Sequence, residues 1–135
     1  CRNKQEKELP IIPLRPAEEV ALEKLDLIRE QKIWQQGQVK EYHTQLTDVV
    51  REYIARRFDV SSTEQTSDET LRAMRPLLNQ QKDLYEQLRK MLSLADLVKF
   101  AKWTATPDEN EISLRNAYTF VKETTPQVEE EIQNS

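Results

Sequence analysis

Few side chains in this sequence are suited to nucleophilic or acid–base catalysis. The 135 residues include one histidine, His43, and one cysteine, Cys1. A serine nucleophile needs a base within hydrogen-bond reach, and no G-x-S-x-G turn accompanies His43. Cys1 is the first residue of a predicted extended segment, which is a poor position for a Cys–His pair. Because His43 follows Tyr42 at the edge of an apolar stripe, we expect a half-buried or surface histidine, no catalytic residues and no enzymatic activity.

The composition predicts neither a metal site nor a cofactor. One cysteine excludes a thiolate zinc cluster, an iron–sulfur site and an intrachain disulfide, and one glycine leaves no Gly-rich phosphate loop. A helical di-iron site needs glutamates three residues before histidines, and none precedes His43 at that spacing. The carboxylate pairs Glu19–Glu23 and Asp48–Glu52 have helical spacing, but a lysine or arginine stands close to each pair. We therefore expect these carboxylates on solvated helix faces.

The charge distribution does not predict nucleic-acid binding. Lys and Arg number 20 against 24 Asp and Glu, which gives a net charge of −4. The densest basic cluster, Arg51, Arg56 and Arg57, is interrupted by Glu52 and Asp59. A nucleic-acid-binding domain typically has a basic stripe and a net positive charge, so we expect no nucleic-acid partner.

Two tryptophans are the candidate interaction anchors. Trp34 comes just before the turn between the first two predicted helices, and Trp103 lies in the loop before the last one. An exposed tryptophan is often a binding hot spot, whereas a buried one closes an end of the core. The sequence leaves both alternatives open for each tryptophan.

Helical periodicity and capping signals predict an all-α protein. Apolar residues repeat at steps of three and four, most regularly over 38–58, and no stretch alternates as a strand does. Thr66 with Glu69 has the spacing of a capping box, and Thr106, followed by proline and Glu109, is the strongest helix start. The expected helices cover 17–36, 38–58, 67–75, 80–93 and 107–123, with 94–101 as a separate short piece.

The apolar stripes predict a single compact bundle of five or six helices. Pro10, Pro13 and Pro16 favour an extended N-terminal tether over 1–16, in which four Lys and Arg face two Glu. The all-α domain is expected over 17–125 and an acidic tail over 126–135. The expected core includes Ala21, Leu25, Ile28, Tyr42, Leu46, Val50, Tyr53, Ile54, Leu71, Met74, Leu88, Leu92, Leu114, Ala117, Tyr118 and Val121.

Three stretches of the chain resemble one bacterial protein family in their order and spacing. They are KIWQQGQVKEYHTQLTDVVREYIARRF (32–58), TSDETLRAM (66–74) and LADLVKFAK (94–102). Over about 17–123 the chain is similar to the C-terminal domain of an uncharacterised membrane-protein family. Its genes lie beside those of MoxR-type AAA ATPases and von Willebrand factor A-type proteins in aerotolerance (Bat-type) operons. Most matching positions, Tyr42 and Phe100 among them, are expected to be helix-core residues.

The resemblance implies a topology and a kind of partner, but no catalytic residues. It implies an extracytoplasmic β-rich domain, one membrane helix and a cytoplasmic helical domain, of which this chain would be the last. A segment preceding Cys1 would then anchor the domain at the cytoplasmic side of the inner membrane, and the basic tether agrees with the positive-inside rule. A MoxR-type ATPase or a von Willebrand A-type protein is the implied partner. A mature lipoprotein also begins with cysteine, so anchoring through a lipidated Cys1 is the alternative.

Two functions from different classes follow from these observations. The first is a non-enzymatic, membrane-anchored adaptor or scaffold domain that binds a protein. The alternative is a small-ligand or regulatory sensor with a pocket between helices, in which Tyr42, His43 or Tyr53 would be inward polar groups. An enzyme that uses carboxylates alone would need a buried carboxylate pair with perturbed titration.

Overall fold

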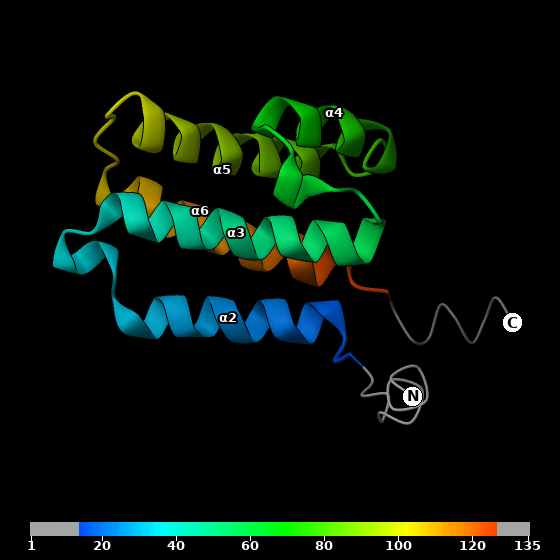
Figure 1. The fold of residues 1–135 in the computed structure, drawn as a ribbon, viewed down its shortest axis with the longest axis horizontal. Helices are drawn as coiled ribbons and strands as arrows, with labels where there is room; N and C mark the ends of the chain where they lie inside the picture. The colour runs from blue at the N-terminus through cyan, green and yellow to red at the C-terminus, as the bar shows by residue number, and fades with distance from the viewer. Residues whose placement is uncertain (1–13, 127–135) are drawn as a thin grey trace, which may run out of the picture.

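A computed structural model describes residues 14–126 of the chain (Figure 1). Within that range there are five α-helices, two short 3₁₀ helices and no β-strand, so the predicted all-α fold is confirmed. The predicted tether, with Cys1, and the predicted acidic tail lie outside the described residues except for 14–16 and Pro126. The elements are α2 (Ala17–Gln31), η1 (Trp34–Gln36), α3 (Val39–Phe58), η2 (Ser62–Glu64), α4 (Ser67–Leu77), α5 (Lys82–Phe100) and α6 (Pro107–Thr124).

Four of the helices form an antiparallel bundle around one core. α2, α3, α5 and α6 alternate in direction, and each packs against its neighbours in the bundle (Figure 1). α4 packs against α5 on the outside of the bundle. Many of the most deeply buried apolar residues of the domain are ones that the periodicity predicts, whereas Phe120 was not predicted. Those with at most 1% of their surface exposed include Leu25, Tyr42, Leu46, Val50, Tyr53, Ile54, Met74, Leu88, Leu92, Ala117, Phe120 and Val121.

Both predicted helix starts are confirmed by their side-chain hydrogen bonds. At α4, Thr66 Oγ1 accepts from the Glu69 amide at 3.2 Å, and Glu69 Oε1 accepts from the Thr66 amide at 2.9 Å. The same reciprocal pair, Thr106 with Glu109, opens α6 at 3.1 and 2.9 Å. Each box satisfies two amides that the first helical turn leaves without partners. Side chains three residues apart therefore determine where α4 and α6 begin.

The first helix is shorter than predicted. It ends at Gln31 rather than at residue 36, because Lys32 adopts a left-handed conformation with φ of 49°. A right-handed helix cannot continue through such a residue. Trp34 then opens the separate 3₁₀ helix η1, which ends at Gln36. Gly37 follows as its C-cap, with a φ of 86° that suits glycine.

The predicted break near residue 93 is wrong. α5 runs without interruption from Lys82 to Phe100. No proline or glycine occurs between these residues, and Ala95 and Val98 continue the buried stripe of Leu88 and Leu92. The long α5 therefore places its last turn beside the start of α6, at the end of the bundle farthest from the start of α2 (Figure 1).

Candidate functional site

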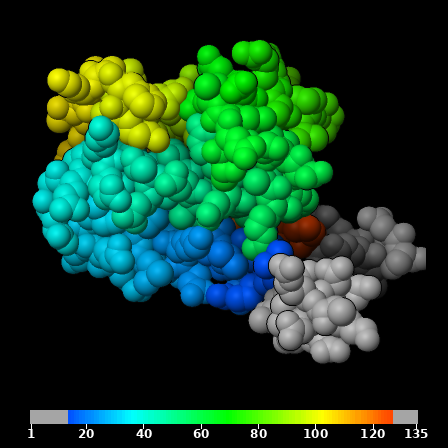
Figure 2. All heavy atoms as spheres, in the orientation of Figure 1, coloured from blue at the N-terminus to red at the C-terminus, as the bar shows by residue number. Residues whose placement is uncertain are grey.

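Large apolar side chains are exposed together at the C-terminal end of α5. Leu97 is 44% exposed, Phe100 79% and Trp103 52%. We call these three residues the α5 apolar patch. Phe100 was expected in the core, but it lies on the face of α5 opposite Leu88 and Ala95, which corrects that prediction. Figure 2 shows the end of α5, in yellow, as a prominence with no other segment in front of it.

A tight turn folds Trp103 back toward the last turns of α5. Lys102 has a left-handed backbone with φ of 54°, which ends the helical path. The Trp103 amide then donates to the Leu97 carbonyl oxygen at 3.0 Å, and the Ala101 amide donates to the same oxygen, also at 3.0 Å. The patch thus rests on a helix and a hydrogen-bonded turn. Such a rigid apolar surface can serve as an interaction anchor at low entropic cost.

The two predicted tryptophan anchors have different environments. Trp34, in η1, is half-buried and packs against the core, whereas about half of Trp103 is open to solvent. Both lie at the same end of the bundle, since η1 joins α2 to α3 there (Figure 1). The structure therefore favours Trp103, with its exposed neighbours Leu97 and Phe100, as the candidate anchor.

His43 is enclosed in the core, which corrects the predicted half-buried or surface position. None of its surface is exposed, and its Nε2 lies 2.7 Å from the Asn110 Oδ1. The Tyr42 hydroxyl donates to the Asn110 carbonyl oxygen at 2.8 Å, so α3 holds the start of α6 through one residue. Asn110 was not among the predicted core or site residues, although it precedes Leu114 and Ala117 on the buried stripe of α6. The side chain of His43 thus joins two helices and has no open approach from solvent.

Acidification is expected to destabilise the domain through His43. Burial lowers the pKa of this imidazole, although its bond to Asn110 and the charge of Glu109 oppose the effect. His43 in the unfolded chain therefore binds a proton near pH 6.5, whereas in the folded chain it binds that proton only at a lower pH. The free energy of unfolding consequently falls as the pH decreases below 6.5. For one proton, the upper limit of this slope is about 1.4 kcal/mol per pH unit.

Urea unfolding of the wild type and of His43→Gln at pH 7.5, 6.5 and 5.5 tests this dependence. We expect the wild type to lose more stability than the variant between pH 6.5 and 5.5, because His43 is the one histidine of the chain. Equal losses in both proteins would show that His43 does not titrate differently in the folded state.

The arginines of the densest basic cluster bind backbone and side-chain oxygens of the protein itself. Arg51 points toward the connection between α3 and α4, where its guanidinium donates to the Ser62 carbonyl oxygen at 2.8 Å and to the Gln65 carbonyl oxygen at 3.0 Å. Arg57 donates to the Thr124 carbonyl oxygen at 2.9 Å, and Arg56 to the Arg15 carbonyl oxygen at 2.5 Å. These three arginines therefore have structural hydrogen-bond partners within the domain.

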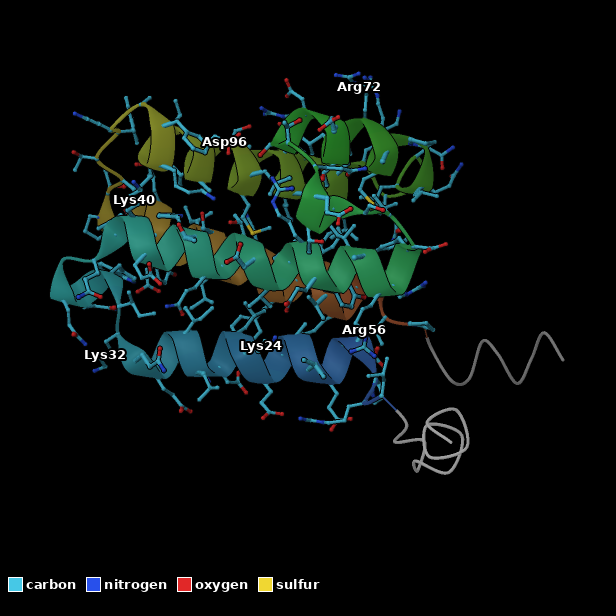
Figure 3. The ribbon with its side chains drawn as sticks, viewed as in Figure 1. Lys24, Lys32, Lys40, Arg56, Arg72 and Asp96 are labelled. Atoms are coloured by element: carbon cyan, nitrogen blue, oxygen red, sulfur yellow. The ribbon has the colours of Figure 1, made fainter. Side chains whose placement is uncertain are left out.

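Three of the four carboxylates in the helical pairs contact surface cations. Arg15 pairs with both Glu19 and Glu23. Lys24, labelled in Figure 3, bridges from α2 to Glu52 of α3 at 2.8 Å. Among residues 14–126, no group of three or more His, Cys, Asp or Glu is placed to hold a metal ion. Glu19, Glu23 and Glu52 therefore have ordinary surface partners.

The polar residues named for a ligand pocket do not converge on one cavity. A groove of about 360 Å³ lies between α2 and α3, and Tyr53 is part of its lining. The Tyr53 hydroxyl, however, lies 2.7 Å from Thr124 Oγ1, while Tyr42 and His43 both bond to Asn110. The groove is otherwise lined largely by small side chains such as Ala17, Val20 and Ala55.

Comparison with protein-family models, with curated proteins and with solved structures finds no match to this chain. In the described residues, none of the helices has the length and apolar content needed to cross a bilayer. The resemblance to the Bat-operon family and the membrane anchor therefore remain predictions.

Proposed function

We propose that this domain is a non-enzymatic protein-interaction module that binds its partner through the α5 apolar patch. The observation that supports this most strongly is the exposure of Leu97, Phe100 and Trp103 on one end of a well-packed bundle. Monomeric soluble proteins rarely leave large apolar side chains clustered in water, and aromatic residues dominate the energetics of interfaces.

The position of the patch fits a domain tethered at its N-terminus. Pro16 and the start of α2 lie at one end of the bundle, whereas the end of α5 lies at the other (Figure 1). A membrane anchor preceding Cys1 would attach to the end of the domain opposite the patch, which suits a partner on the cytoplasmic side of the inner membrane. By family resemblance, that partner is a MoxR-type ATPase or a von Willebrand A-type protein.

Removing the aromatic rings of the patch is expected to abolish partner recovery. The full-length membrane-anchored protein would be crosslinked in its native cells and isolated, as wild type and with Phe100→Ala and Trp103→Ala combined. Loss of two aromatic hot-spot residues typically costs more than about 2 kcal/mol of binding free energy, so the dissociation constant should rise at least roughly thirtyfold and partner recovery should fall with it.

The matched control is the double variant Leu27→Ala and Leu77→Ala. Both leucines are 49% exposed and lie on α2 and α4, outside the patch. We expect the control to recover the ATPase or the von Willebrand A-type protein as the wild type does. Equal recovery by the patch variant, with both candidate partners expressed, would contradict the proposal.

A further inference from the structure

The groove between α2 and α6 contains a second group of functional side chains, separate from the α5 apolar patch. It forms a hollow of about 380 Å³ that is open to solvent. α6 contributes Glu111, Leu114, Arg115, Tyr118 and Lys122 to its lining, and α2 contributes Arg29. This volume lies within the range of small-molecule pockets, which is about 300–1,000 Å³.

We call this hollow the Tyr118 pocket, because two of its cations contact the ring of Tyr118. The Arg29 guanidinium carbon lies 5.6 Å from the centre of the Tyr118 ring, and Lys122 Nζ lies 5.5 Å from it. Both distances are typical of cation–π contacts. The Tyr118 hydroxyl donates to Asp26 Oδ1 at 2.5 Å, which fixes the ring and occupies one oxygen of the carboxylate beside Arg29. Burial, together with this bond, raises the pKa of Tyr118 to about 12, so it remains a donor at neutral pH.

The charge of the lining is positive although the whole chain is acidic. The lining side chains include three cations, Arg29, Arg115 and Lys122, and one carboxylate, Glu111, in a chain of net charge −4. The carboxylates of Asp26 and Glu30 on α2 lie close enough to act on Tyr118 and offset part of this positive charge. Arg29 has a long 3.5 Å contact with Asp26. No ion pair found among residues 14–126 engages Arg115 or Lys122. Arg29 and Lys122 are thus positioned by the Tyr118 ring without being fully neutralised.

We propose that the Tyr118 pocket binds a small phosphorylated anion. A phosphomonoester has a charge of about −1.5 to −2 at pH 7, which is opposite in sign to the three cations of the lining. The two guanidinium groups supply planar paired donors for phosphate oxygens, and Lys122 supplies a point charge. Leu114 and the Tyr118 ring provide an apolar surface for the organic part of the ligand.

Two sources of this phosphate chemistry can be separated by experiment. One is a soluble phosphomonoester, and the other is the headgroup of an anionic phospholipid. The probes are sn-glycerol 3-phosphate and vesicles of phosphatidylglycerol in phosphatidylcholine, with sodium chloride of equal ionic strength as the reference. Amide chemical shifts of the ¹⁵N-labelled chain report glycerol-phosphate binding, and co-sedimentation reports vesicle binding.

Two double variants each remove two positive charges, one from the Tyr118 pocket and the other from α4. Arg115→Gln with Lys122→Gln removes two cations of the pocket. Arg72→Gln with Arg75→Gln removes two from α4, where Figure 3 shows Arg72 on the side of the bundle away from α2. We expect saturable shifts at Tyr118 and Thr119 with glycerol phosphate, about tenfold weaker binding in the pocket variant and unchanged binding in the α4 variant.

Saturable binding of either probe that the pocket variant alone weakens would support the site, and the probe that binds identifies the source. Shifts that sodium chloride reproduces, no saturable binding of either probe, or equal weakening in both double variants would overturn it. Trp103→Ala should leave phosphate binding unchanged, which keeps this test independent of the protein-interaction proposal.

Discussion

Phe120→Ala is expected to lower the free energy of unfolding by about 3–5 kcal/mol, the usual cost of truncating a fully buried aromatic residue. None of the Phe120 surface is exposed. Its ring packs edge-on against Tyr53, with centroids 6.0 Å apart, and lies 6.4 Å from the Phe58 ring. Alanine would remove these contacts between α3 and α6 and leave a cavity that the surrounding helices cannot fill.

Urea unfolding followed by circular dichroism measures this loss. A domain of this size is typically stable by about 5–15 kcal/mol, so the variant should unfold at a clearly lower urea concentration than the wild type. Ile112→Ala is the matched control on the same helix, since Ile112 is 42% exposed, and we expect it to cost less than about 1 kcal/mol. A Phe120→Ala loss as small as that of the control would mean that Phe120 is not a central core residue.

Arg51→Ala is expected to cost about 2–4 kcal/mol and to release the connection between α3 and α4, because bonds from a charged donor are worth about 1.5–3 kcal/mol. Besides its two carbonyl partners, the guanidinium donates to Ser67 Oγ at 3.0 Å and to Thr70 Oγ1 at 3.2 Å. Four oxygens of the η2 segment and of α4 thus share a single donor group. Replacing Arg51 by alanine would leave these four largely enclosed oxygens without the guanidinium donor.

Two measurements separate this effect from a general loss of stability. Amide hydrogen exchange should accelerate across 59–70 in Arg51→Ala before it does in the rest of α3. Arg51→Lys should fall between the wild type and alanine, because an ammonium group cannot reproduce the planar set of donors. Arg72→Ala, on the exposed side of α4, should change little. Unchanged exchange across 59–70 would contradict the clamp described for Arg51.

The features that the sequence predicted correctly depend on neighbouring residues. The capping boxes at Thr66 and Thr106 each involve residues three positions apart, and the stripe of α3 needs only helical periodicity. The break at Lys32 was missed because a left-handed lysine has no local signature. The continuity of α5 was missed although the absence of proline and glycine over 82–100 indicates it.

The parts of the site that were missed depend on distant contacts or on helix faces. His43 is buried because Asn110, 67 positions away, accepts its hydrogen bond, and no spacing rule connects the two. Leu97 and Phe100 could have been placed on the outer face of α5, had α5 been predicted as one helix. The exposure of Trp103 depends on the turn at Lys102, which becomes visible only in the structure. The Tyr118 pocket combines residues of the first and last helices of the bundle.

The most direct test of the α5 apolar patch is site-specific photocrosslinking in living cells. The photoreactive residue p-benzoylphenylalanine would replace Phe100 in one full-length protein and Leu77, on α4, in another. We predict that position 100 forms an adduct with a MoxR-type ATPase or a von Willebrand A-type protein, and that position 77 does not. The same adducts from both positions, or none from position 100 in cells that express both proteins, would contradict the assignment of this patch as the docking surface.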